Sequence, residues 1–218
     1  MSDRIELDAL AATINQYQKK VREAAEKWQR VQQRSLVTVN TIMGLVSKLV
    51  LSSNKALYSK NLSKFYDIEE RLTAKLIDHI GRKIPELRRS VDFLSSIVRE
   101  QEDLRKQLVL NLKDTARYFF DPGSSKSSDW RLIEQAEDFT NMIVEMYSTE
   151  LQVRLTIVHE MESKPLKPAV YSLLMTIWAA EPYIELGRLE DILEEIVCLE
   201  ETLNSRLHEI GTATANPV

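Results

Sequence analysis

Residues 146–193, MYSTELQVRLTIVHEMESKPLKPAVYSLLMTIWAAEPYIELGRLEDIL, contain most of the sharp turns in the chain. Four turn-forming residues divide this stretch: Pro165, Pro168, Pro182 and Gly187. They separate the end of a long amphipathic helix, a short apolar helix that carries Trp178, and the start of an acidic helix. Long helices on either side must fold back at these breaks if they are to share a core. The stretch therefore predicts a proline-punctuated helical corner near the C-terminus.

The N-terminal part of the chain carries a heptad pattern. Apolar side chains recur three and four residues apart, at Leu7, Leu10, Ile14, Tyr17, Val21, Ala24, Trp28 and Val31. The pattern shifts at Ser35 and resumes at Val39, Ile42, Val46 and Leu49, which is the effect of a four-residue insertion. We therefore predict one long helix over residues 1–51 that changes its packing partners near Ser35.

The two halves of this helix should face different partners, because a helix in a monomeric bundle needs only one apolar stripe. We expect residues 42–49 to pack into the chain's own core and the earlier half to project and pair with a helix of another protein. The candidate partner-binding residues are Leu7, Leu10, Ile14, Tyr17, Val21, Trp28 and Val31.

The rest of the chain also shows helical periodicity. A second long helical run is predicted over residues 64–120, where Gly81 and Pro85 predict either a kink or two helices that meet. Residues 121–129 are predicted to be a loop that ends on the N-cap residues Ser128 or Asp129. C-terminal helices are predicted over residues 130–211, with Gly211 ending the last one and residues 212–218 forming a flexible tail. The predicted fold is all-α: one domain over residues 1–211, built as an elongated bundle of long antiparallel helices.

Composition narrows the class of protein. Apolar residues make up 44 % of the 218 residues and charged residues 28 %, which is typical of a globular chain. The net charge of −4 argues against a general nucleic-acid binder, so we expect no direct nucleic-acid contact. Cys198 is the only cysteine, which fits a reducing compartment. The N-terminus lacks a signal-peptide core, and the most apolar run, residues 35–51, is too polar and short for a membrane span, so no membrane contact is expected.

A search for reactive groups finds no catalytic pattern. The five glycines stand too far apart for a phosphate-binding loop. His159 and Glu160 begin like a zinc-protease motif, but Ser163 occupies the position of the second histidine. We therefore expect no catalytic residue, cofactor or metal, and no enzymatic activity. Two charged clusters leave alternatives open. The acidic face of the last helix is either a solvated surface or a docking site for a basic partner. The basic residues around Pro85 either pair with acidic neighbours or touch phosphate.

Two segments resemble the C-terminal signature of a known family: Met146-Tyr147-x-x-Glu150-Leu151-x-x-Arg154-x-Thr156, and Trp178-x-x-x-Pro182-Tyr183-x-Glu185 with Arg188-Leu189. Together with Trp28 and Trp130 they resemble the cyclin-dependent kinase 2-interacting protein family. The matching corner residues are Tyr147, Trp178, Pro182, Tyr183 and Arg188. They are expected to pack the corner, with direct partner contact as the alternative.

The resemblance implies a nuclear adaptor, with the cytoplasm as a second location, that links a cyclin-dependent kinase and its cyclin to DNA replication and to checkpoint proteins. It also implies a subunit of an AAA ATPase complex that acts in chromatin protein turnover and large-ribosomal-subunit maturation, alongside a second small helical protein. The residues alone leave two other functions open: a structural coiled-coil protein of another assembly, or an enzyme whose site is not recognised.

Overall fold

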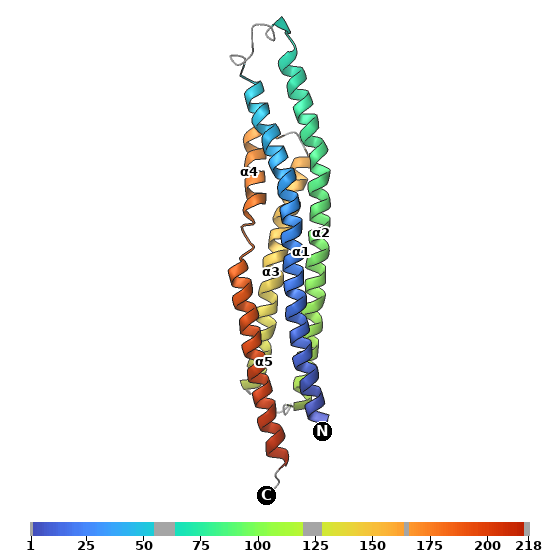
Figure 1. Cartoon of the computed structure of the whole chain (residues 1–218), viewed down its shortest axis with the longest axis vertical. Coiled ribbons are helices and arrows are strands. Elements are labelled where there is room, and N and C mark those ends of the chain that lie inside the picture. Colours follow the sequence, from blue (N-terminus) through green and yellow to red (C-terminus); the bar gives the residue numbers. More distant parts are fainter. Residues whose placement is uncertain (1, 55–63, 120–127, 164–165, 216–218) are drawn as a thin grey trace. The chain divides into compact units, whose positions relative to one another are not determined.

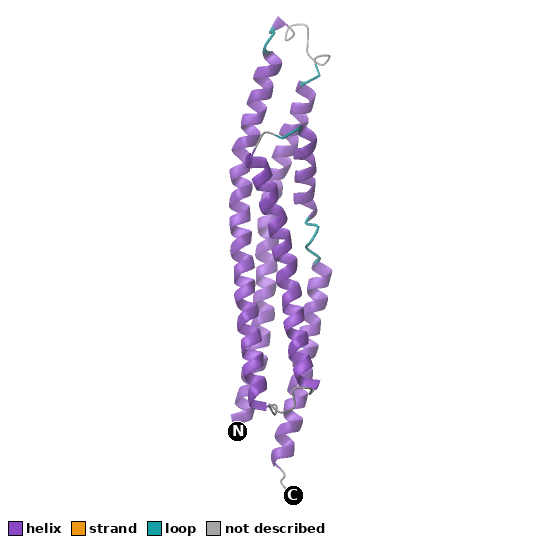
Figure 2. Cartoon of the chain, turned by 180° about the vertical axis from the view of Figure 1, so that it is seen from behind, coloured by secondary structure: helices purple, strands orange, loops and turns teal. Residues whose placement is uncertain are grey.

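The computed structural model describes residues 2–54, 64–119, 128–163 and 166–215, and these confirm the all-α class. Across this part of the chain there are five helices and no strand (Figure 2). The helices are α1 (Ser2–Ser52), α2 (Ile68–Phe119), α3 (Ser128–Ser163), α4 (Pro168–Ala180) and α5 (Leu186–Ala215). The predicted loop at residues 121–129 lies outside the described residues up to residue 127, and α3 begins at Ser128.

Backbone contacts divide the chain into two compact units. Unit 1 combines Met1–Glu26, Ile97–Ser148 and Ile184–Val218, and unit 2 combines Lys27–Ser96 and Thr149–Tyr183. Within unit 1, α1 and α3 run in one direction and α2 and α5 in the other (Figure 1). Within unit 2, α1 and α3 again run in one direction, and α2 and α4 run in the other. Each unit is therefore an up-down-up-down bundle of helical segments. That the chain is a single domain over residues 1–211 stays a prediction.

The buried stripe of α1 corrects the prediction that its first half projects from the protein. In unit 1 the stripe consists of Ile14, Tyr17, Val21 and Ala24, all at most 4 % exposed. In unit 2 it continues through Trp28, Gln32, Ser35, Val39, Ile42, Val46 and Leu49. The prediction for residues 42–49 is confirmed, because Ile42 is fully buried. The apparent shift arose because two places on the stripe hold the polar residues Gln32 and Ser35, which a search for apolar residues passes over.

Helix α2 continues through Pro85, so the alternative of two separate helices is wrong. Proline lacks the backbone N–H that would bond the carbonyl four residues earlier, and its ring crowds that carbonyl. The residue four positions earlier is Gly81, and both residues lie on the exposed side of the helix. The released carbonyl therefore faces solvent, and the helix tolerates the missing bond.

Helix α4 begins and ends where the prolines predict. Pro168 occupies the first turn, after Lys167 in an extended conformation, as expected because that position needs no backbone donor. Tyr171, Met175 and Trp178 form its buried side. Pro182 cannot continue the helix, and Glu181 before it adopts a left-handed conformation with φ 45° and ψ 59°.

The predicted end of the last helix at Gly211 is wrong, because α5 continues to Ala215. A glycine inside a helix costs only about 1 kcal/mol relative to alanine, so one glycine does not have to end it. Residues 212–215 are therefore helical, and the rest of the predicted tail, 216–218, lies outside the described residues.

One helical stretch, Ala12–Ser52, is long and apolar enough to cross a membrane by length and composition alone. This differs from the prediction made for the shorter run 35–51. Core helices pass the same test, and α1 carries a buried stripe along this stretch. The buried stripe accounts for part of this composition, because 39 % of the apolar window is buried.

Candidate functional site

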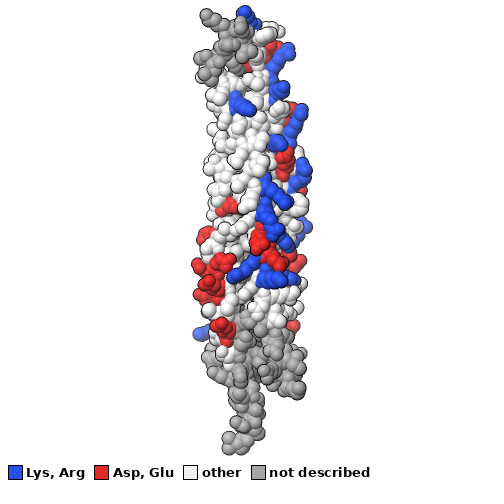
Figure 3. All heavy atoms as spheres, in the orientation of Figure 1, with Lys and Arg blue, Asp and Glu red and all other residues white. Residues whose placement is uncertain are grey.

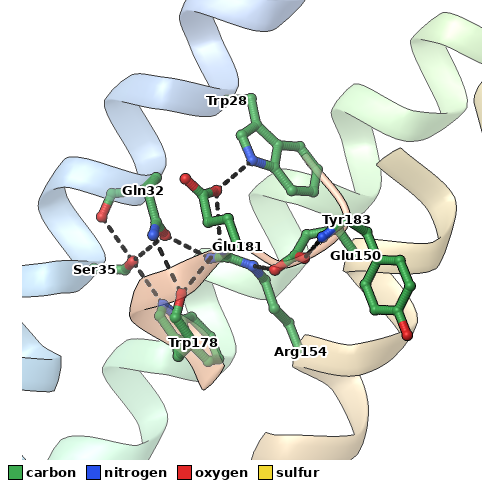
Figure 4. A network of polar contacts seen from close by, with 8 residues as sticks. All are labelled: Trp28, Gln32, Ser35, Glu150, Arg154, Trp178, Glu181 and Tyr183. Atoms are coloured by element: carbon green, nitrogen blue, oxygen red, sulfur yellow. Dashed lines mark hydrogen bonds and ion pairs between the residues drawn. The ribbon is translucent and has the colours of Figure 1, made fainter. Parts of the chain in front are cut away.

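A buried guanidinium, that of Arg154 on α3, lies at the centre of a polar network in unit 2 (Figure 4). Its side chain is 0 % exposed. Nε donates to Oε1 of Glu150, one helical turn earlier, at 2.9 Å. Nη1 donates to Oε1 of Gln32 on α1 at 2.7 Å, and Nη2 donates to Oε1 of Glu181 at 2.8 Å. One side chain therefore joins α1, α3 and the residue that ends α4.

Two indole rings enclose the same guanidinium. Its central carbon lies 4.8 Å from the ring centroid of Trp178 and 5.6 Å from that of Trp28. A desolvated cation over an indole face gains on the order of 2 kcal/mol from the ring quadrupole. The rings also exclude water, which strengthens each hydrogen bond that Arg154 makes.

The C-terminal end of α4 is capped by this network. The last carbonyls of a helix have no partner within the helix. The carbonyl of Trp178 accepts a hydrogen bond from Gln32 Nε2 at 3.2 Å and a longer one from Arg154 Nη2 at 3.5 Å. A cation is also favoured at this end by the helix dipole. Arg154 and Gln32 thus satisfy a buried carbonyl that would otherwise be costly.

The polar side of α1 completes the network. Trp178 Nε1 donates to the hydroxyl of Ser35 at 2.9 Å, and that hydroxyl donates to the carbonyl oxygen of Gln32 at 2.8 Å. Gln32 is 5 % exposed and Ser35 is 2 % exposed. Buried polar groups in a core are tolerated when each has a partner, and both of these do. The break in the heptad pattern at these residues is therefore where α1 binds α4.

Glu181 holds a strained backbone in place. A left-handed conformation costs a residue other than glycine about 1–2 kcal/mol. Its carboxylate oxygen Oε1 accepts from Arg154 and from Trp28 Nε1, both at 2.8 Å. These two charge-assisted bonds offset the backbone strain. They fix the direction in which the chain leaves α4.

Glu150 anchors the residue that follows the corner. Its carboxyl group is 0 % exposed, and its second oxygen, Oε2, accepts from the backbone N–H of Tyr183 at 3.3 Å. The first oxygen is held by Arg154. The two oxygens of one buried carboxylate therefore connect α3 with the segment after α4.

The charges in this network do not balance. One guanidinium faces the two carboxylates of Glu150 and Glu181, which leaves a net charge of −1 when all three are ionised. Burial raises the pKa of Glu181 above its ordinary value. The bond from Trp28 and the charge of Arg154 lower it in part, and the charge of Glu150 raises it further. Protonation of Glu181 would make the network neutral.

The arrangement suits the positioning of helices better than catalysis. The groups in contact are a guanidinium, two carboxylates, an amide, a hydroxyl and two indoles, and the hydroxyl of Ser35 is closed off by Trp178 and Gln32. Among the described residues, no group of three or more His, Cys, Asp or Glu side chains could hold a metal ion. A groove of about 80 Å³ in unit 1, between α1 and α2, is lined by Tyr17 and by amide side chains. Burial raises the pKa of Tyr17 above its ordinary value, so its phenol stays neutral.

The candidate partner-binding residues lie mostly inside the protein, and this corrects the prediction that they form a free surface. Ile14, Tyr17 and Val21 are buried in unit 1, and Trp28 is buried in unit 2. Val31 is half-buried. The side chains of Leu7 and Leu10 lie outside the described part. The physical reason is that the heptad stripe is the chain's own bundle seam.

The signature corner residues separate into two groups. Tyr147 and Trp178 are fully buried, in units 1 and 2 respectively, which fits their packing role. Pro182, Tyr183 and Arg188 are exposed, with Tyr183 48 % exposed, so their side chains do not form the core. Trp178 is the one predicted site residue of the corner that contacts Arg154 directly.

Five members of the network were absent from the predicted site: Gln32, Ser35, Glu150, Arg154 and Glu181. Two signals in the sequence could have identified four of them. Gln32 and Ser35 interrupt an apolar seam, and Glu150 and Arg154 form an i,i+4 pair within the apolar side of a helix. The role of Glu181 depends on its backbone conformation, for which the sequence gives only the following proline.

The two charged clusters predicted from the sequence differ in how far their residues form ion pairs. Three of the basic residues around Pro85 form ion pairs: Arg82 with Asp78, Lys83 with Glu86, and Arg88 with Glu162. This supports pairing with acidic neighbours. On the acidic face of α5, Glu190 pairs with Arg22 within unit 1 at 3.1 Å.

Comparison with known proteins gives a family and corrects the resemblance. The family described as "CA109-like: Ribosome biogenesis protein C1orf109-like" matches residues 8–202. No curated protein matches the chain. The assignment to the cyclin-dependent kinase 2-interacting protein family is therefore wrong. Glu150, Arg154 and Trp178, which carried that resemblance, fix a helical corner, and this structural task does not identify a partner. The chain belongs to the C1orf109-like family of ribosome biogenesis proteins.

Proposed function

We propose that this chain is a non-enzymatic adaptor that holds protein partners together during maturation of the large ribosomal subunit. The observation that carries the proposal is the family match over residues 8–202. The buried network supports the non-enzymatic part of the proposal. Its polar groups bind one another and leave no reactive group directed at a substrate, so its role is to fix the geometry of three helices.

Of the partners implied earlier, we retain the AAA ATPase complex and a second small helical protein. These were expected in connection with ribosome maturation, which agrees with the family to which the chain belongs. All of these partners came from the corrected resemblance, and the cyclin-dependent kinase and checkpoint partners are not retained because the family match gives them no support. Ribosome maturation begins in the nucleus, so we place the chain there.

The test combines depletion with purification. Depleting the protein from its own cells should cause precursors of the large-subunit rRNA to accumulate, and re-expression should restore processing. Affinity purification of the tagged protein with mass spectrometry should recover AAA ATPase subunits. Unchanged rRNA processing after depletion would overturn the proposed function. Impaired processing without recovery of an ATPase would overturn only the choice of partner.

A further inference from the structure

Helix α4 has an unusual composition for a helix on the outside of a bundle. Its 13 residues, PAVYSLLMTIWAA, include no charged side chain. Tyr171, Met175 and Trp178 face the interior. The opposite side is exposed, with Leu173 59 % and Val170 38 % exposed. A surface helix normally carries charged residues on its outer face, whereas a helix that is apolar all round is normally buried.

The neighbouring part of α1 extends this uncharged surface. The hydrogen bond from Trp178 to Ser35 places α4 beside α1 within unit 2. Residues 36–51 of α1 contain a single charged residue, Lys48, and expose Val37 and Gly44. Figure 3 shows a broad area over α4 and this half of α1 in which few charged side chains appear. We name α4 together with residues 36–47 of α1 the uncharged face, which Lys48 borders.

The charged residues of α1 and of the start of α4 that border the uncharged face are basic, whereas the acidic Glu181, which is bound by Arg154, directly follows the end of α4. Between Lys27 and Asn54, α1 and the turn after it contain no Asp or Glu. Arg34 and Lys48 on α1 and Lys167 at the start of α4 are all exposed. Unit 2 as a whole has 16 Lys and Arg against 10 Asp and Glu, a net charge of +6, in a chain whose total is −4.

We propose that the uncharged face binds an amphipathic helix of a partner protein, whose apolar stripe is flanked by Asp and Glu. The partner's stripe would cover Leu173 and Val170, and its carboxylates would reach Lys48, Arg34 and Lys167. Helix α4 spans about 20 Å, which matches four turns of a partner helix. This proposal rests on the adaptor function only in assuming that a partner protein exists. It adds which surface of this chain binds the partner and what chemistry the partner helix has.

Charge decides between the possible occupants. A second copy of this chain would bring Lys48, Arg34 and Lys167 against the same cations, and like charges across an interface are unfavourable. A nucleic acid would need cations within the contact area, whereas here they lie only at its borders. An acidic amphipathic helix satisfies both the apolar centre and the basic border.

The test uses two synthetic helical peptides of about 20 residues with the same leucine stripe. One carries glutamate on both flanks of the stripe, and the other carries lysine at those positions. Fluorescence anisotropy with the full-length protein should show at least tenfold tighter binding of the glutamate peptide. Leu173→Glu should weaken that binding at least tenfold, and Lys48→Glu should reduce the preference between the peptides. Leu110→Glu, at a position 60 % exposed on α2 in unit 1, should leave binding unchanged.

Circular dichroism melting of each variant checks that it is folded before its binding is interpreted. Equal binding of both peptides, or no effect of Leu173→Glu, would overturn the proposal. So would a dimer in sedimentation that Leu173→Glu dissociates, because a second copy would then cover the face. Binding to anionic vesicles that the same variant abolishes would assign the face to a membrane and overturn the proposal as well. None of these outcomes depends on rRNA processing, so this proposal and the adaptor function can fail separately.

Discussion

Replacing Arg154 by methionine should destabilise the protein by about 3–5 kcal/mol, because it leaves a buried carboxylate without its cation. Methionine keeps an unbranched stem of similar length and removes the hydrogen-bond donors. Glu150, which is 0 % exposed, then retains only the N–H of Tyr183, at 3.3 Å. Glu181 loses one of its two donors, and the carbonyl of Trp178 loses the longer of its two bonds.

The expected loss is a large share of the whole stability, which is about 5–15 kcal/mol for a typical protein. With a urea dependence of about 2 kcal/mol per M, the midpoint of unfolding should fall by about 2 M. Trp28 and Trp178 flank the mutated side chain, so tryptophan fluorescence reports on unit 2 directly. A Trp130→Phe background removes the third tryptophan and with it the signal from outside this unit.

A matched variant separates the charge from the packing. Arg154→Met combined with Glu150→Gln and Glu181→Gln removes every charge of the network, and the two glutamines keep the shapes of the glutamates. Because the penalty arises mainly from unpaired buried carboxylates, this triple variant should recover at least half of the lost midpoint shift. A triple variant as unstable as Arg154→Met alone would refute the reasoning and assign the loss to the packing between the two indoles.

Three further predictions concern single positions. Glu181 has a raised pKa in the folded protein, so folding favours its protonated form, and stability should fall as pH rises from the unfolded pKa through the raised folded pKa. The free energy of unfolding of Glu181→Gln should therefore rise relative to that of the wild type as pH increases through this window, as measured by urea titrations between pH 4 and 8. A difference between the two proteins that does not change with pH would contradict this. Val21→Glu, at a position 1 % exposed, should abolish cooperative melting in circular dichroism, whereas Val37→Glu, at a position 68 % exposed, should leave it intact. Equal melting of the two variants would show that Val21 does not lie in a buried stripe of α1. Gly81→Ala should raise stability by about 1 kcal/mol in urea unfolding, because its new methyl group meets nothing within 4 Å, and a loss would show that glycine is needed beside Pro85.

Helix periodicity predicted the elements of the fold well, because each helix buries a stripe that recurs every three to four residues. The first and second helices were predicted within a few residues of their ends, and Pro168 and Pro182 defined α4. The errors occurred where one residue type allows two outcomes. Pro85 on an exposed side is tolerated within α2, and Gly211 does not end α5.

The site was less predictable, because its contacts join residues that are distant in the sequence. Arg154 and Gln32 are 122 positions apart, and Trp178 and Ser35 are 143 apart. Periodicity identifies which side of a helix is buried, but it does not say which other helix that side meets. The seam of α1 was therefore assigned to another protein, when α2, α3, α4 and α5 of the same chain supply its partners within the two units.

The buried network explains how an apolar helix can be held in one orientation. Apolar packing alone tolerates small rotations and shifts of a helix, because many arrangements bury similar areas. A buried guanidinium does not tolerate such movements, because any rotation of α4 that breaks its bonds to Glu181 or to the Trp178 carbonyl leaves unpaired polar groups. We therefore infer that the network gives unit 2 conformational specificity, a role for which buried polar or ionic groups are known in some proteins. If the triple variant proves more stable than Arg154→Met yet loses the preference for the glutamate peptide, the network will have been shown to orient α4 for its partner.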